Sequence, residues 1–150
     1  MKTESKTRAI IVDIDGTLAN ISARRMHVTG PKKDWKNFNA NVHTDTLNVW
    51  CREIMVRMQN EFKILLVSGR EGSLKKTTEK WLAENDVPYD QLFMRKAKDY
   101  RKDTIVKLEI YEKEIKPKYD IFFVIDDRAS VVKMWREQGL VCLQCDEGDF

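Results

Sequence analysis

Short apolar runs alternate with longer amphipathic segments along most of the chain. The apolar runs are rich in Ile, Val, Leu and Phe, and they predict five strands, at residues 9–13, 63–67, 91–94, 121–125 and 140–144. Apolar side chains at helical spacing predict four helices, at residues 45–60, 73–84, 103–115 and 129–138. We expect Thr44 to cap the first of these helices and Gly139 to end the last one.

The order of these elements predicts the fold class. Strands that alternate with helices and are apolar throughout form a parallel sheet covered on both faces. We therefore expect an α/β protein, a Rossmann-like three-layer α/β/α sandwich around a five-stranded parallel sheet. No linker-like segment interrupts the 150 residues, which predicts a single domain over residues 1–150. Apolar residues in 19–43 do not recur at a regular helical or strand spacing. We therefore expect this segment to form a small cap, or flap, after the first strand, with Trp35 and Phe38 packing it onto the site.

Polar and charged side chains follow three of the predicted strands. The first strand leads into Asp13 and Asp15, the second into Ser68-Gly69-Arg70 and the fourth into Asp126-Asp127-Arg128. Sites in parallel α/β sheets form at the carboxyl ends of the strands, so these groups converge on one edge. Four carboxylates there need a cation, and hard oxygen ligands suit Mg²⁺. Gly16 permits a tight turn whose backbone amides would face an anion, which predicts a phosphate held against a metal and a carboxylate.

The motifs at these positions resemble those of the haloacid dehalogenase superfamily. In chain order they are "DIDGTL", "SGR", "RKDTIVK" and "IDDR". Within the superfamily, the chain is similar to the 3′-phosphatase domains of bacteriophage polynucleotide kinase-phosphatases. This narrower resemblance rests on "VDIDGTLA", on an Arg eleven residues after the first Asp, and on "VSGRE", "RKDTIVKLEI", "IDDRASVVKMWREQGLVC" and the terminal "GDF", which together span nearly the whole chain.

The resemblance implies a mechanism with an aspartyl-phosphate intermediate. Asp13 would be the nucleophile and a Mg²⁺ ligand that stays ionised. Asp15 would act as general acid and then as general base, would offer the metal only its backbone carbonyl, and would therefore be able to keep a proton. Asp127 would complete the metal site, with Asp126 as a further candidate ligand.

The resemblance also implies how the phosphate is held. Thr17, Ser68 and Gly69 would bind the phosphoryl group, and Arg24 and Arg70 would hold the substrate or the transferring group. Lys107 would add positive charge, oriented by Asp103 one helical turn earlier, and the competing candidate for this lysine is Lys102.

We expect from these residues a Mg²⁺-dependent phosphomonoesterase that acts on the 3′-phosphate ends of DNA or RNA. The alternatives are a 5′(3′)-nucleotidase acting on free nucleotides, and a non-catalytic module that binds nucleic-acid ends; an inactive descendant would be expected to lose Asp13 or Asp15, and both are present. The chain contains no GxxxxGK[ST] loop, so we expect no kinase domain within it. A separate 5′-kinase or ligase would act on the same ends, and no obligate protein partner is implied.

Composition indicates where the protein is located and suggests one further contact with nucleic acid. Charged residues make up 34% of the chain, no apolar run is long enough to span a membrane, and three cysteines do not form a disulfide framework, so we expect a cytoplasmic protein without membrane contact. The basic run from Arg95 to Lys102 predicts a contact with a nucleic-acid backbone.

Helical spacing assigns Trp50 to the core, along with Trp81 and Trp135, and leaves Trp35, Phe38 and Tyr100 as candidates for stacking on a base. We expect Arg128 to pair with a neighbouring Asp rather than to touch substrate.

Overall fold

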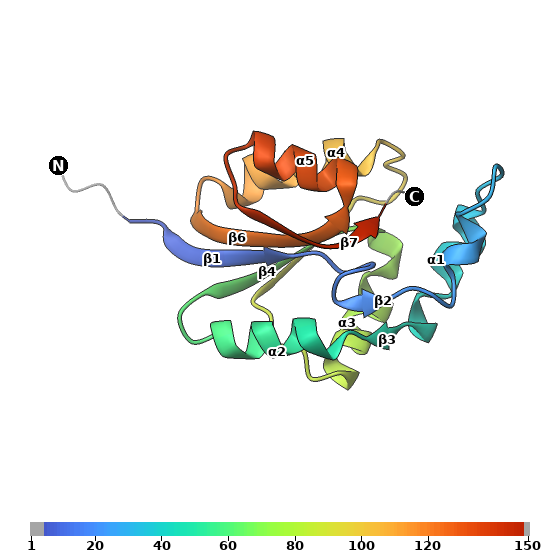
Figure 1. The fold of residues 1–150 in the computed structure, drawn as a ribbon, viewed down its shortest axis with the longest axis horizontal. Helices are drawn as coiled ribbons and strands as arrows, with labels where there is room; N and C mark the ends of the chain where they lie inside the picture. Colours follow the sequence, from blue (N-terminus) through green and yellow to red (C-terminus); the bar gives the residue numbers. More distant parts are fainter. Residues whose placement is uncertain (1–4, 149–150) are drawn as a thin grey trace.

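The computed structural model describes residues 5–148, and its centre is a five-stranded sheet (Figure 1). The strands are β1 (Thr7–Val12), β4 (Lys63–Glu71), β5 (Gln91–Arg95), β6 (Tyr119–Arg128) and β7 (Cys142–Gly148). Their order is β5-β4-β1-β6-β7, and every neighbouring pair is parallel. This confirms the expected α/β class. Because β4 and β6 flank β1, the residues that follow or end these three strands meet at one edge of the sheet.

Helices cover both faces of the sheet, which gives the expected three layers (Figure 1). One layer contains α2 (Val49–Met58) and α3 (Lys75–Glu84), and the other contains α4 (Asp103–Ile110) and α5 (Ala129–Glu137). Alternate residues of β1 point into the two layers: Ile10 belongs to the same buried cluster as Met55 of α2, whereas Ile11 belongs to the cluster of Trp135 of α5. No helix within residues 5–148 is long and apolar enough to cross a membrane.

The start of α2 differs from the expectation. The helix begins at Val49 rather than at residue 45, and Asn48, not Thr44, takes the N-cap position. The cause is a second small sheet, in which β2 (Ala19–Asn20) pairs antiparallel with β3 (Thr46–Leu47) and keeps that part of the chain extended. Thr44 instead ends a 3₁₀ turn, Val42–Thr44.

The other helices lie close to their expected places. The helix expected over 103–115 is α-helical only as far as Ile110, and it continues as a π-helical turn, Tyr111–Ile115. Gly139 follows α5 with a φ of 82°, so it takes the left-handed conformation that ends a helix.

Residues 19–44 form a small cap beyond the carboxyl edge of the sheet (Figure 1). The cap contains a 3₁₀ turn, Arg25–His27, and the helix α1 (Trp35–Ala40). It has its own apolar centre of Ile21, Val28 and Phe38. Trp35 packs edge-on against Phe38, with 5.5 Å between the ring centroids, and stays 43% exposed.

Candidate active site

Three buried carboxylates lie together at the carboxyl edge of the sheet. Asp13 directly follows β1, and Asp126 and Asp127 belong to the end of β6. One oxygen of each lies within 4.8 Å of the others, close enough to share a cation. Three like charges in a buried place repel one another, so this cluster needs a counter-charge.

Asp13 is held by one hydrogen bond to each of its oxygens. Lys107 Nζ donates to Oδ1 at 2.8 Å, and Thr17 Oγ1 donates to Oδ2 at 3.0 Å. Burial raises the pKa of Asp13 well above its usual range, Asp126 and Asp127 raise it further, and Lys107 opposes them. The Thr17 hydroxyl therefore orients the carboxylate of Asp13 in this structure, and its expected contact with a phosphate stays a prediction.

Asp126 and Asp127 have different surroundings. Both oxygens of Asp126 are in use: Oδ1 accepts from the backbone N–H groups of Asp127 and Arg128, and Oδ2 accepts from Lys107 Nζ and Trp135 Nε1. Asp127 Oδ2 is buried and has no hydrogen-bond partner, and burial together with Asp126 raises the pKa of Asp127 to about 6. Of the two candidates, Asp127 is thus the one with an oxygen available to a metal.

Two glycines make room for that carboxylate. A Cβ at Gly16 would lie 2.1 Å from Asp127 Oδ2, and one at Gly148 would lie 2.7 Å from the same atom. Gly16 also has a φ of 83°, which other residues rarely adopt. Gly148 is the described part of the terminal "GDF", whose last two residues lie outside residues 5–148.

Lys107 lies within the carboxylate cluster, whereas Asp103 pairs with arginines outside it. Lys107 is buried, and although burial lowers its pKa, Asp126 and Asp13 raise it more, so the ammonium is retained. The expected pair of Asp103 with Lys107 is wrong: the Asp103 carboxylate binds Arg95 Nη2 and, at 2.8 Å, Arg128 Nη1. This confirms that Arg128 pairs with an Asp.

Lys102 is exposed and takes the N-cap position of α4, where its backbone carbonyl accepts hydrogen bonds from the first turn. Between the two candidates, Lys107 is therefore the lysine that contacts the carboxylate cluster. A Cβ at Gly69 would lie 2.6 Å from Asp103 Oδ1. The absence of a side chain at Gly69 therefore lets the Asp103 carboxylate, which binds Arg95 and Arg128, approach β4.

Asp15 is clamped by two arginines. Arg24 Nη2 lies 2.6 Å and Arg70 Nη2 2.7 Å from Asp15 Oδ1, and Arg70 Nε donates to the same atom. Burial alone would raise the pKa of Asp15, but Arg70 and Arg24 outweigh it and lower the pKa to about 2. The expectation that Asp15 keeps a proton is therefore wrong in this conformation, where it is an ionised partner of both guanidinium groups.

Asp45 completes this cluster and was missed from the sequence. Its carboxylate accepts from Arg24 Nε and Nη2, both at 2.7 Å, and from Arg70 Nη2 at 3.0 Å. Arg24 is fully buried, and its guanidinium also lies 4.2 Å from the centre of the Phe38 ring. Two buried arginines need a second acid besides Asp15, but their burial is not visible in the sequence, so no pattern there points to Asp45.

The two arginines thus hold carboxylates in this structure, and a contact of either one with the substrate stays a prediction. Phe38 is 4% exposed beneath Arg24 and is not available for stacking on a base. Ser68 is buried at the end of β4, where its Oγ accepts from the Arg70 backbone N–H at 3.1 Å.

The turn at Gly16 uses amides that were expected to face an anion. The N–H of Gly16 donates to the Ala19 carbonyl at 2.9 Å, and the N–H of Thr17 donates to the Ile14 carbonyl at 3.1 Å. The turn therefore shapes the site through its tightness, and these two amides are not phosphate donors.

Much of the basic run also has internal partners. Arg95 donates to the backbone carbonyls of Gly69, Asp99 and Arg101, and Arg101 pairs with Asp99 and Glu109. These two arginines therefore shape the loop before α4, and a contact of this loop with a nucleic-acid backbone stays a prediction. Tyr100, on the same loop, is 87% exposed.

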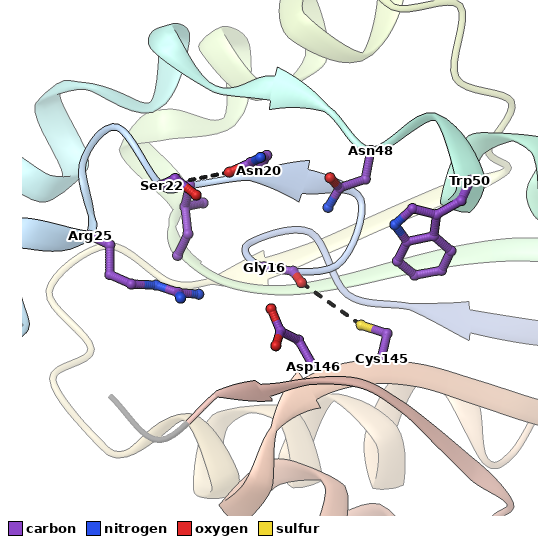
Figure 2. Close-up of a pocket in the computed structure, with 9 residues that line it drawn as sticks. Gly16, Asn20, Ser22, Arg25, Asn48, Trp50, Cys145 and Asp146 are labelled. Atoms are coloured by element: carbon purple, nitrogen blue, oxygen red, sulfur yellow. Dashed lines mark hydrogen bonds between the residues drawn. The ribbon is translucent and has the colours of Figure 1, made fainter.

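A pocket of about 170 Å³ opens beside the turn at Gly16 (Figure 2). Trp50 lines it and is 44% exposed, so the expected place of Trp50 in the core is wrong, whereas Trp81 and Trp135 are buried as expected. Cys145 also lines the pocket, and its Sγ lies 3.6 Å from Thr17 Oγ1.

The donor set fits a hard divalent cation. Asp13 and Asp127 supply carboxylate oxygens, one of which is buried without a partner, and no sulfur or nitrogen belongs to the candidate cluster found among residues 5–148. Mg²⁺ is typically held by one or two carboxylates and completes its shell with water or substrate oxygens.

Comparisons with known proteins agree with this geometry. A family model of the phosphatase domain of polynucleotide kinase PNKP matches residues 7–150. A putative bifunctional polynucleotide kinase/RNA ligase of Autographa californica nuclear polyhedrosis virus is 30% identical over 131 residues, which cover 87% of this chain and 18% of that protein. The chain thus spans less than a fifth of this relative.

Solved structures show the same fold. A chain of the Pnkp1/Rnl/Hen1 complex superposes with a TM-score of 0.85 at 37% identity, over 99% of this chain and 49% of that one. The HAD family enzyme bt-2542 of Bacteroides thetaiotaomicron, solved with magnesium and inorganic phosphate, has a TM-score of 0.56 at 13% identity over 96% of both chains, a likeness of fold alone. The chain belongs to the family of polynucleotide kinase PNKP phosphatase domains, within the haloacid dehalogenase superfamily.

Proposed function

We propose that this phosphatase domain is a Mg²⁺-dependent polynucleotide 3′-phosphatase that works through a phosphoryl group on Asp13. The observation that carries the proposal is the pair of carboxylates at the sheet edge: Asp13, fixed by Lys107 and Thr17, and Asp127, whose buried Oδ2 has no partner. The family of the chain supports phosphate-ester chemistry on nucleic acids.

In the first step, a carboxylate oxygen of Asp13 attacks phosphorus, and the bond from phosphorus to the 3′-oxygen breaks. Lys107 and Thr17 aim the Asp13 carboxylate, and the Lys107 ammonium also offsets the negative charge of the cluster. Ser68 would donate its hydroxyl proton to a phosphoryl oxygen, since its Oγ already accepts from the Arg70 N–H. Mg²⁺ bound by Asp13, Asp127 and the Asp15 carbonyl would neutralise phosphoryl oxygens as charge builds up.

Asp15 would give a proton to the leaving 3′-oxygen and later take one from the water that hydrolyses the intermediate. With a pKa of about 2 in the arginine clamp, Asp15 gains a proton only after its carboxylate leaves Arg24 and Arg70. Asp45 holds both guanidinium groups independently of Asp15. Asp45 would therefore keep the two arginines paired while Asp15 turns toward the substrate.

The test compares phosphate release from a 3′-phosphorylated oligonucleotide with release from free 3′- and 5′-mononucleotides. The proposal predicts the higher kcat/KM on the oligonucleotide, in Mg²⁺ and not in EDTA. A higher kcat/KM on mononucleotides would instead support a 5′(3′)-nucleotidase.

A second comparison separates catalysis from mere binding of nucleic-acid ends. Asp13→Asn keeps the size of the side chain and removes the nucleophile, so turnover should vanish while the variant still folds. Asp34→Asn, a matched change of an exposed cap acid, should keep turnover. Near-normal turnover of Asp13→Asn would refute the nucleophile assignment.

A further inference from the structure

The pocket beside the catalytic turn is built from three separate parts of the chain. Cap residues form one side, the start of α2 contributes Asn48 and Trp50, and the end of β7 contributes Cys145 and Asp146 (Figure 2). Gly16, from the catalytic turn, also lines it. With a volume of about 170 Å³, the pocket is smaller than the roughly 300–1,000 Å³ typical of sites that enclose a drug-sized ligand, so it suits one ring system.

The pocket adjoins the turn that carries the catalytic carboxylates, although Asp13 and Asp127 do not line it themselves. Gly16 does line it, and a Cβ on Gly16 would lie 2.1 Å from Asp127 Oδ2, so this glycine belongs both to the pocket wall and to the surroundings of that carboxylate. On the other side, Cys145 Sγ lies 3.6 Å from Thr17 Oγ1, which itself donates to Asp13. A group attached to a phosphate at Asp13 therefore has this pocket as an adjoining space.

Trp50 is the one large aromatic side chain among the residues that line the pocket. It is 44% exposed, whereas the next residue, Cys51, and Met55 one turn later are fully buried against the sheet. The indole points into the pocket from above Cys145 (Figure 2). The indole is thus only half buried although its spacing matches the apolar stripe of its helix, and mismatches of this kind are expected at functional or strained sites.

The position of Trp50 is fixed relative to the catalytic turn. Asn48, two residues earlier, donates its side-chain amide to the Thr17 carbonyl at 2.7 Å, and its backbone N–H donates to the Leu18 carbonyl at 2.8 Å. These two bonds tie the first turn of α2 to the residues that follow Asp13 and Asp15. Trp50 thus presents a pre-positioned aromatic face at a set place beside the site.

We infer that Trp50 is the stacking surface for the base of the terminal nucleotide, whose 3′-phosphate is removed at Asp13. The inference rests on the proposed 3′-phosphatase function and adds to it a subsite for the nucleoside. Stacking is tolerant of sequence because every base has a π-face, so this subsite would select nucleotides over other phosphate esters without selecting one base.

The test uses two oligonucleotides that differ only in the last nucleoside. Both carry a 3′-phosphate, one on an ordinary nucleoside and one on an abasic tetrahydrofuran residue. Trp50→Ala should lower kcat/KM about 10-fold on the first, mainly through KM, and less than about 2-fold on the second. Trp50→Leu, which keeps apolar bulk, should behave like the Ala variant, and Trp50→Phe should recover most of the loss.

Val56→Ala is the matched control, because Val56 lies on the same helix, is 38% exposed and does not line the pocket. It should show no loss that depends on the base. Equal losses of Trp50→Ala on both oligonucleotides, or a base-dependent loss in Val56→Ala, would overturn the subsite while leaving the 3′-phosphatase in place. Absence of phosphate release by the unmodified protein from either oligonucleotide would overturn the proposed function itself, and the subsite with it.

Discussion

Replacing Gly16 with Ala should damage the site far more than the fold. Two effects act at this position: a φ of 83°, which an L-residue adopts at a cost of about 1–2 kcal/mol, and a Cβ placed 2.1 Å from Asp127 Oδ2. Gly139 provides a matched control, because its φ is 82° and nothing lies within 4 Å of a Cβ placed there. Comparing the two variants separates backbone strain from the collision with Asp127.

The magnitudes follow from the geometry. Side-chain contacts of a Cβ essentially never fall below 3.0 Å, so Asp127 or the turn must move by about 1 Å in Gly16→Ala. A displacement of about 1 Å in a catalytic group can lower the rate about 100-fold. Backbone strain alone predicts a loss of about 1–2 kcal/mol in the free energy of unfolding for both variants, or roughly 2–8 °C in Tm.

Phosphate release and thermal unfolding measured on both variants provide the assay. Gly139→Ala should lose stability and keep kcat/KM within about 2-fold of the unmodified protein, whereas Gly16→Ala should lose about 100-fold in kcat/KM. The reasoning is refuted if the two variants lose the same activity, or if Gly16→Ala stays fully active.

Three other changes test the charged clusters. Lys107→Met should lower kcat at least about 100-fold in a phosphate-release assay, because it removes the cation that holds the nucleophile, and Lys102→Met should not. Arg24→Lys should lower the free energy of unfolding by about 3 kcal/mol in urea, since a lysine cannot hold both carboxylates, whereas Arg57→Lys in an exposed pair should change it by less than about 1 kcal/mol. Because the pKa of Asp15 is lowered in the folded state, its ionised carboxylate stabilises the fold above about pH 4. In EDTA at pH 7, the free energy of unfolding of the unmodified protein should therefore exceed that of Asp15→Asn by about 2 kcal/mol. This difference should disappear as the pH falls through about 2. An advantage that is constant from pH 5 to pH 2 would contradict the arginine clamp.

The sheet and its helices could be predicted because their signal is local. The run at residues 63–67 becomes part of a strand in which residues 64–67 are buried, and a parallel sheet follows from the alternation of such strands with helices. The carboxyl ends of these strands bring Asp13, Ser68 and Asp127 to one edge, which is also predictable from the sequence.

Side-chain partners could not be predicted in the same way, because they depend on where the cap folds back. Asp45 was assigned to a helix, and only the pairing of β2 with β3 puts its carboxylate between Arg24 and Arg70. Asp103 had the spacing to pair with Lys107, but the buried carboxylates of Asp13 and Asp126 hold that lysine.

Trp50 shows the limit of helical periodicity. Its spacing matches the apolar stripe of α2, yet the buried positions of that helix are Cys51 and Met55, and Trp50 lies half exposed in the lining of the pocket. A sequence pattern locates a face of a helix, and it cannot show that another segment leaves an opening next to that face.

The most direct test of the proposed mechanism looks for the phosphoryl group on Asp13. The protein is mixed with a 3′-phosphorylated oligonucleotide in Mg²⁺, and the reaction is quenched in acid within a single turnover. The protein is then digested, and the masses of its peptides are measured by mass spectrometry. The peptide that contains Asp13 should gain one phosphoryl group, and the gain should be absent from Asp13→Asn and from the reaction in EDTA. Phosphorylation of another residue, or turnover by Asp13→Asn at a near-normal rate, would contradict the assignment of Asp13 as the nucleophile.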